Sequence, residues 1–461
     1  MLPFENATGS AELNYAGDDL AEGLIDSLSS TPKLRVVPRN KAFRFRDETD
    51  DLQHVGRELG VRAILTGRIT LRGDVLSVRA ELIDIAKDSQ LWGAQVSRPS
   101  NDLLEIQEEI AKQVRDKLQG PSSAGSKSSK SVKAAPKPAP AINKEAYQLY
   151  VRATHHCNKW TQEGIQLAID LCRQAIDIDP VYAAPYATMA LGYTVLTVFG
   201  PADSENAFRQ GKAYAQKALQ LDDTLAEAHA ALGFMALTDF NLAEAIREGK
   251  RAIELNPKLG MAYYVYAQAM GCAGDLAEAV ARAREGCDAD PLMAPVNYCY
   301  GLMLYYAHRW DDAEKQLRRT LEINPDFGLA QRMRAIVLTR GGRFEEGMAE
   351  CRKFLEKLPN DVWELLLAYV AALGGDRELA QEVLARHAGD DHPAASFFFA
   401  TIYGVFRDFD RGFAALERAR DMRFLVLSSA AVNPALEPFR GDPRWPAFLK
   451  SMNFGVEVPL S

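Results

Sequence analysis

The segment IELNPKLGMAY, residues 253–263, contains the first of a series of prolines that recur at a constant interval. Each interval is 34 residues, and the local pattern returns with it, as in TLEINPDFGLA, residues 320–330. The prolines of this series are Pro257, Pro291, Pro325, Pro359 and Pro393. A residue that precedes proline is kept out of the helical region, whereas proline itself is tolerated in the first turn of a helix. Each of these prolines therefore indicates where one helix ends and the next begins.

Small residues recur at two matching offsets, which is expected if helices pack closely in pairs. Two earlier residues, Pro180 and Asp223, stand in the same local sequence pattern, and we count them with these prolines as markers of the repeat. Ten residues after successive markers stand Ala190, Gly233, Ala267, Gly301 and Ala335. Twenty-two residues after the markers stand Ala245, Ala279, Ala313, Gly347 and Ala415. A period of 34 residues is typical of a tetratricopeptide (TPR) unit of two antiparallel helices. The sequence thus predicts an all-α TPR superhelical solenoid.

Irregularities in the series predict where the array departs from its period. About eight helix pairs are expected over residues 142–424, with extra residues at 158–161 and in TVFGPADSEN, residues 197–206. The unit after Pro359 has Tyr369 and Gln381 at the two small positions, so we expect it to be distorted. Residues 425–461 are predicted to form a capping helix pair, because a terminal repeat must cover the last apolar face.

Residues 120–141, GPSSAGSKSSKSVKAAPKPAPA, separate the array from an N-terminal part. They contain only Gly, Pro, Ala, Ser, Lys and one Val, a composition that cannot bury enough apolar surface to order itself. We interpret them as a flexible linker. Contact of its four lysines with an acidic partner or a nucleic acid is the alternative to a solvated tether.

Residues 1–119 are predicted to form a small α/β sandwich domain. Helices are expected from Asp18 and Asp19 onward, over residues 52–59 with Gly60 as the C-cap, and from Ser100 or Asn101 onward. Strands are expected at residues 34–37, at 61–71, after a turn at Gly73–Asp74, and around Trp92. Residues 2–4 read as the end of a further strand. The apolar stripes expected on the first and last helices are Leu20, Leu24, Ile25 and Leu28, and Leu103, Ile106, Ile110, Val114 and Leu118; the alternating apolar residues expected on the hairpin strands are Ala63, Leu65, Ile69 and Leu71, and Leu76, Val78, Ala80 and Leu82.

Three stretches of this domain carry a resemblance to a known family: residues 2–39, LGVRAILTGRI at 59–69 and LIDIAKDSQLWGAQ at 82–95. They resemble the TolB-like N-terminal α/β domain that precedes TPR arrays in bacteria. The resemblance continues in AIDLCRQAIDIDPVYA at 168–183 and in DPRWPAFLKSMNF at 442–454. It implies a position downstream of a Ser/Thr kinase, an adenylate cyclase or a winged-helix regulator, and it names an architecture rather than a reaction. The sequence departs from that pattern in lacking a full apolar strand before LPF and in carrying none of these output domains.

Composition limits the partners. With 54 basic and 62 acidic residues the net charge is −8, which provides no general attraction for nucleic acid. No stretch is long and apolar enough for a membrane helix, and no secretory leader is recognisable. We therefore expect a cytoplasmic chain, with an extracytoplasmic location as the alternative if it lies downstream of a membrane anchor.

The sequence lacks a combination of residues that would predict catalysis. Asp326–Phe327–Gly328 resembles a kinase magnesium motif, but the other kinase motifs are absent and the tripeptide directly follows Pro325. The six cysteines are dispersed and are interpreted as buried thiols. His387 and His392 lie near Asp390 and Asp391, and we expect no metal there. The prediction is a protein without catalytic residues, cofactor or metal.

A candidate binding surface follows from the positions that line the inner face of a TPR solenoid. They select Phe234, Leu237, Tyr264, Gln268, Tyr298, Leu302, Tyr305, Tyr306, Arg332 and Trp363. This set is aromatic and lightly charged, and we expect it to bind an extended peptide, chiefly through Tyr298, Tyr305 and Arg332. The alternative is that these side chains pack inside a tightly wound solenoid or receive the N-terminal domain.

The sequence therefore favours a non-enzymatic scaffold that binds a protein or peptide in its concave groove. The alternative is the sensory or regulatory arm of a bacterial signalling protein whose output domain is absent here. A third reading is a small-ligand site at residues 197–206 or in the α/β domain. Neither nucleic acid nor membrane is an expected partner, and a homo-oligomer formed through the α/β domain is left open.

Overall fold

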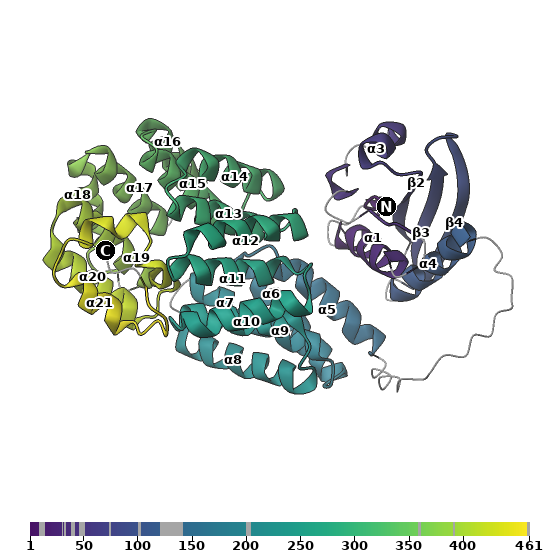
Figure 1. Cartoon of the computed structure of the whole chain (residues 1–461), viewed down its shortest axis with the longest axis horizontal. Coiled ribbons are helices and arrows are strands. Elements are labelled where there is room, and N and C mark those ends of the chain that lie inside the picture. The colour runs from purple at the N-terminus through teal and green to yellow at the C-terminus, as the bar shows by residue number, and fades with distance from the viewer. Residues whose placement is uncertain are drawn as a thin grey trace. The chain divides into compact units, whose positions relative to one another are not determined.

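The computed structural model of this chain contains two compact units, Met1–Arg152 and Ala153–Ser461 (Figure 1). The expected linker at residues 120–141 and the turn at Gly73–Asp74 lie outside the described residues. The expected domain limits at 1–119, 120–141, 142–424 and 425–461 stay predictions. The structure describes residues 1–8, 14–29, 31, 34–37, 42–45, 51–72, 75–99, 103–119, 142–199, 204–357, 361–390 and 392–458. Among these residues, none of the helices has the length and apolar character needed to span a membrane.

The first unit contains a four-stranded sheet in the order β1–β2–β3–β4. Its strands are β1 (Glu5–Asn6), β2 (Ala63–Arg72), β3 (Val75–Asp84) and β4 (Ser89–Pro99). β1 runs parallel to β2, and the other neighbours are antiparallel. Ile69, Val78 and Val96 are paired across three strands and are all buried, so the expected alternation of apolar residues is confirmed.

Helices α1 (Asn14–Ser29), α3 (Leu52–Leu59) and α4 (Leu103–Gln119) and the short 3-10 helix η2 (Phe43–Phe45) also belong to this unit. α1 packs on α4, and α4 covers β3 and β4. On α3, Val55 packs with Leu2 and Ile64. Gly60 ends α3 with a φ of 61°, a left-handed conformation that glycine adopts without strain, which confirms the predicted C-cap.

Three expectations for this unit are wrong. Asp18 and Asp19 lie inside α1, because the helix already begins at Asn14 and continues through Gly17, which packs closely against the Phe4 backbone. Residues 34–37 form no strand, since the edges of the described sheet are β1 and β4. The strand expected at residues 2–4 is instead the two-residue β1, which begins at Glu5.

Sixteen consecutive helices follow among the described residues. They are α5 (Lys144–Cys157), α6 (Gln162–Ile178), α7 (Ala183–Phe199), α8 (Ser204–Leu221), α9 (Ala226–Thr238), α10 (Leu242–Leu255), α11 (Gly260–Cys272), α12 (Leu276–Ala289), α13 (Ala294–Tyr306), α14 (Trp310–Ile323), α15 (Gly328–Arg340), α16 (Phe344–Lys357), α17 (Asp361–Gly374), α18 (Arg377–Arg386), α19 (Pro393–Phe406) and α20 (Phe409–Asp421). From α7 onward each odd-numbered helix packs on the next even-numbered one. This is the TPR-like solenoid that the 34-residue period predicts.

Small residues allow the helices of each pair to approach closely. A Cβ atom on Gly233 would lie 3.3 Å from Glu248 Cβ of its pair partner α10 and 2.6 Å from Val265 of α11 in the next repeat, and one on Gly301 would lie 3.0 Å from Leu317 of its pair partner α14. Polar caps begin the second helices: the side chains of Asn241 and Asp275 accept hydrogen bonds from backbone N–H groups three residues later. The repeated sequence signature therefore has a direct role in packing.

The irregular repeats change helix length. α7 and α8 have 17 and 18 residues, whereas α9 has 13, so the extra residues near 197–206 extend helices. In the unit after Pro359, α18 has only 10 residues. Tyr369, which replaces the expected small residue, is buried and accepts a hydrogen bond from Arg340 at 2.9 Å.

The C-terminal segment, defined here as residues 425–454, does not form the expected helix pair. It contains the 3-10 helices η3 (Leu425–Ser429) and η4 (Pro434–Phe439) and the short helix α21 (Trp445–Ser451). Four prolines between residues 434 and 446 remove backbone donors, which disfavours continuous helices. The ring of Phe439 packs on Gly404 of α19 and Gly412 of α20.

We predict that Gly412→Ala destabilises the repeat domain, because its Cβ would lie 2.6 Å from two ring atoms of Phe439. The cost should be about 1–3 kcal/mol, as for other overpacked cores, and chemical denaturation would measure it. Gly328→Ala is the matched control, since Gly328 is also helical and has no atom within 4 Å of the added Cβ. Equal stability of the two variants would contradict the docking of Phe439.

Candidate functional site

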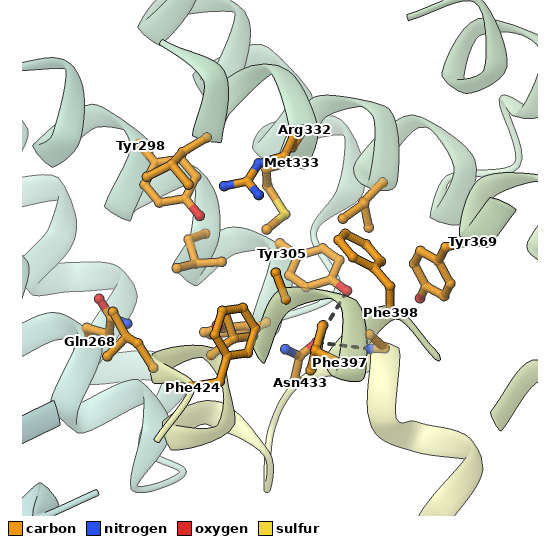
Figure 2. Close-up of a pocket in the computed structure, with 18 of the residues that line it drawn as sticks. Gln268, Tyr298, Tyr305, Arg332, Met333, Tyr369, Phe397, Phe398, Phe424 and Asn433 are labelled. Carbon is orange, nitrogen blue, oxygen red and sulfur yellow. Dashed lines mark hydrogen bonds between the residues drawn. The ribbon is translucent and has the colours of Figure 1, made fainter. Parts of the chain in front are cut away.

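The inner face of the repeat domain contains a cavity of about 130 Å³ (Figure 2). The first helices of successive repeats supply most of its wall, because the 34-residue period places corresponding side chains in register. Tyr264 and Gln268 come from α11, Tyr298 and Tyr305 from α13, and Arg332 from α15. The opposite wall comes from α19 and from the residues around the start of the C-terminal segment.

Seven of the ten residues selected from the sequence line this cavity: Tyr264, Gln268, Tyr298, Leu302, Tyr305, Tyr306 and Arg332. The other three lie elsewhere. Phe234 stacks on Trp160 with ring centroids 5.7 Å apart, and Leu237 is fully buried. Trp363 stacks on Phe354 at 4.9 Å, between α16 and α17. The repeat offsets thus identify a real cluster, although not all of its members.

The expectation that these side chains form an exposed wall is corrected by the structure. Tyr264 and Tyr305 are 3% and 2% exposed, because the C-terminal segment lies against the first helices. The hydroxyl of Tyr305 donates a hydrogen bond to Asn433 Oδ1 at 3.4 Å, and Arg340 donates to the Pro434 carbonyl at 2.8 Å. The observed geometry agrees with the alternative, in which these side chains pack inside the solenoid. Peptide binding by these residues stays a prediction.

Further contacts extend this closure to the earlier repeats. The Leu242 N–H, at the start of α10, donates a hydrogen bond to the Phe454 carbonyl at 2.9 Å. Just before the C-terminal segment, Arg423 forms an ion pair with Asp239 at 2.6 Å. The chain thus links the end of the array to α9 and α10.

Sequence reasoning missed several residues of this site. Trp160 lies in the turn between α5 and α6 with a φ of 49°, and it contacts Phe234 and Tyr264. Phe424 and Asn433 reach the cavity from outside the helical repeats. The dense apolar run LVLSSAAVNPALEPF, residues 425–439, is the signal that could have indicated a buried segment.

Polar groups inside the cavity are incompletely paired among the described residues. The indole N–H of Trp160 and the side-chain carbonyl of Gln268 are buried without a hydrogen-bond partner. Arg332 is half-buried, and none of the described carboxylates forms an ion pair with it. Burial lowers the pKa of Arg332, an effect that Tyr298 opposes, and burial raises the pKa of Tyr298 to about 12.

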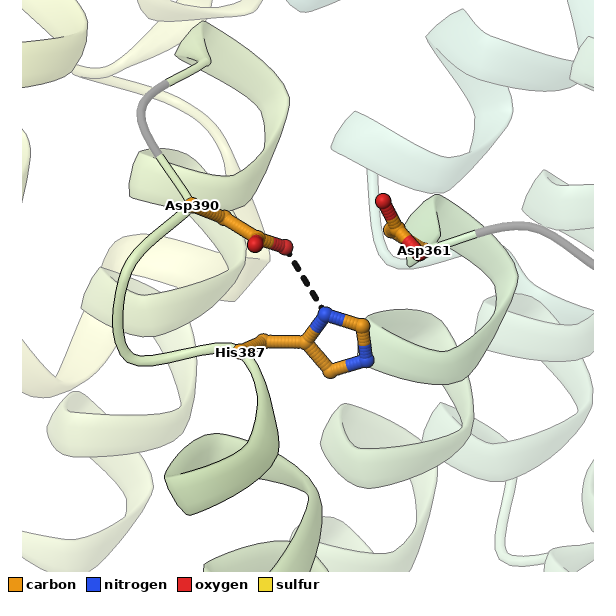
Figure 3. A group of neighbouring side chains, drawn as sticks. All are labelled: Asp361, His387 and Asp390. Atoms are coloured by element: carbon orange, nitrogen blue, oxygen red, sulfur yellow. Dashed lines mark hydrogen bonds and ion pairs between the residues drawn. The ribbon is translucent and has the colours of Figure 1, made fainter.

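A second group, Asp361, His387 and Asp390, places one potential ligand atom from each residue within 4.8 Å of the others (Figure 3). His387 Nδ1 lies 2.8 Å from Asp390, and its Nε2 lies 3.0 Å from Glu364. Since both acceptors are carboxylates, both ring nitrogens donate only when the imidazole is protonated. His392, the other histidine considered from the sequence, caps α19, while Asp391 lies outside the described residues.

The charge state of His387 is controlled by opposing effects. Burial disfavours its protonated form, but the hydrogen bonds to Glu364 and Asp390 and the charges of these carboxylates outweigh burial and raise the pKa of His387. The arrangement is therefore that of an ion-pair network between α17 and the end of α18, with a buried imidazole and partly exposed carboxylates.

Residues 1–113 match the family described as HilA/YgeH-like transcriptional regulator, second domain. The putative adenylate cyclase 3 of Rhizobium meliloti is 28% identical over 233 residues, which are 50% of this chain and 38% of that protein. Transcriptional regulator HilA of Salmonella typhimurium is 28% identical over 130 residues, 28% of this chain and 24% of that protein. This chain therefore spans well under half the length of these curated relatives.

Solved TPR structures are similar to the repeat array only at low scores. A tetratricopeptide repeat protein from Parabacteroides merdae has a TM-score of 0.35 and 14% identity, and the match covers 64% of this chain and 99% of that protein. The assignment of a TPR-like fold therefore rests on the helix pairs and their period in this chain.

We predict that His387 stabilises the fold in a pH-dependent way. Its pKa is higher in the folded chain than in the unfolded one, so the stabilisation is complete below about pH 6.5 and is lost as the pH rises through the raised pKa. Urea unfolding of wild type and His387→Asn at pH 6 and pH 9 should show a difference of about 1–3 kcal/mol at pH 6 that shrinks at pH 9. A difference that does not depend on pH would contradict this network.

Proposed function

We propose that this chain is the regulatory arm of a signalling protein and acts as a protein-interaction scaffold without catalysis. The observation that carries this proposal is that stretches of this chain are similar in sequence to a putative adenylate cyclase and to a transcriptional regulator. Both relatives are much longer than the matched regions. A chain whose stretches resemble proteins with such different named activities is suited to control an output rather than to perform it.

The chemistry of the described residues agrees with a non-catalytic role. Burial raises the pKa of the Cys157 and Cys272 thiols to about 12, so they stay protonated at neutral pH and are poor nucleophiles. The ring nitrogens of His387 are both engaged by carboxylates. The TolB-like assignment of the first unit, a cytoplasmic location and a homo-oligomer through that unit belong to this proposal as predictions.

A chimera tests the regulatory role directly. The 233 matched residues of the Rhizobium meliloti relative are replaced by the aligned residues of this chain, and cyclic AMP production is measured in cells. We expect cyclic AMP production by the chimera to differ several-fold from that of a control in which an unrelated helical-repeat protein of the same length is inserted. Output equal to that of this control would overturn the proposal.

Groove binding is the second candidate, because the inner wall already holds a segment of the chain, the C-terminal segment, in the observed structure. A partner peptide that binds Tyr298, Tyr305 and Arg332 would have to replace or share contacts of the C-terminal segment. Tyr264, Gln268, Leu302 and Tyr306 would take part in the same surface, whereas Phe234, Leu237 and Trp363 are buried elsewhere.

Hydrogen exchange separates these two candidates. We expect the amides of Leu242 and Leu436, which are hydrogen-bonded to Phe454 and Asn433, to stay protected when a captured protein partner is bound. Protection should persist because the segment is part of the core. Faster exchange of both amides in the complex would instead favour groove binding, and the amide of Ala279 within α12 serves as an internal reference.

A further inference from the structure

We propose that the cavity of the repeat domain binds a small carboxylate with an apolar, ring-sized body, anchored by Arg332. This goes beyond the regulatory role, since it assigns a ligand site to the chain itself. The size of the site is the first argument. A cavity of about 130 Å³ is close to the roughly 150 Å³ apolar cavities that accommodate benzene. Leu302, Met333 and Phe397 provide apolar surface for such a body.

The unpaired guanidinium is the second argument. Figure 2 shows Arg332 extending from α15 toward Tyr298, with Met333 beside it. Arg334, two residues along the same helix, pairs with Glu314 at 3.1 Å and Glu350 at 2.7 Å. Arg332 has no such carboxylate among the described residues, although it lines an aromatic cavity. A charge in these surroundings is costly unless an anion pairs with it, and a planar guanidinium suits a carboxylate in two-point contact.

Two uncharged groups make this a built site. Gln268 and Trp160 both line the cavity and are 4% and 3% exposed, and the side-chain carbonyl of the first and the indole N–H of the second have no hydrogen-bond partner among the described residues. The indole can donate to a carboxylate oxygen, whereas the Gln268 carbonyl can accept from a hydroxyl or amino group. The site therefore suits carboxylates that carry one further donor, such as aromatic or branched hydroxy acids and amino acids.

The contacts that border the site disfavour larger occupants. Asn433 and Phe424 border the cavity, and Asn433 is hydrogen-bonded to Tyr305. A peptide segment would require these contacts to open, but a ring-sized molecule would not. A small ligand is consequently favoured over a polypeptide for this volume.

Benzoate and its neutral isostere benzamide are the probes for the test, with the full chain and calorimetry as the direct readout. We expect benzoate to bind and to raise the melting temperature, and benzamide to bind about 10–100-fold more weakly because it cannot pair with the guanidinium. Equal affinities for the two, or no binding of benzoate up to 10 mM, roughly the weak limit of a specific site, would overturn the proposal.

Arg332→Met supplies the second test, because it keeps the length of the side chain and removes the charge. We expect the variant to lose benzoate affinity by the same factor while remaining folded. Arg318→Gln is the control, since Arg318 is exposed on α14 and its loss changes net charge equally. Undiminished benzoate binding by Arg332→Met would overturn the assignment. The comparison of benzoate with benzamide on wild type needs no variant, and neither test depends on the output of the chimera.

Discussion

Docking of the C-terminal segment against the first helices of the repeats determines what this solenoid can bind. Trp445, Phe439, Leu436 and Leu449 are at most 1% exposed. Full burial of such side chains contributes about 1.5–3 kcal/mol each, or on the order of 6–12 kcal/mol for the four. A peptide that displaced the segment would have to offset this free energy before showing any net affinity, so closure is the dominant constraint on the inner face.

The period of the sequence predicts the repeat domain well because its determinants are local. Pro257 and Pro325 mark helix junctions, and Gly233 and Gly301 lie where a side chain would meet the next helix. The same reasoning locates the inner-face residues. It cannot show whether they are exposed, since residues that cover Tyr264 and Tyr305 lie more than 100 positions away along the chain.

The residues missed from the sequence share a physical cause. Trp160 is in a turn with positive φ, and Asn433 is between two 3-10 helices, so neither obeys a helical period. Local sequence patterns also cannot predict which arginine forms an ion pair. Arg332 and Arg334 are two residues apart on one helix, and only the packing of α14 and α16 gives Arg334 its two carboxylates. The candidate site therefore depends on tertiary contacts even where its residues were identified.

Closure also changes how the array responds to a ligand. In an open solenoid each repeat contacts only its neighbours, so a local perturbation spreads through successive interfaces. Here the C-terminal segment joins α19 and α20 to α10 through Phe439 and the Leu242–Phe454 hydrogen bond. The cavity is bordered by middle repeats on one side and by this segment on the other. A molecule held between them would add its binding free energy to the contact that closes the array, and so would stabilise distant repeats together.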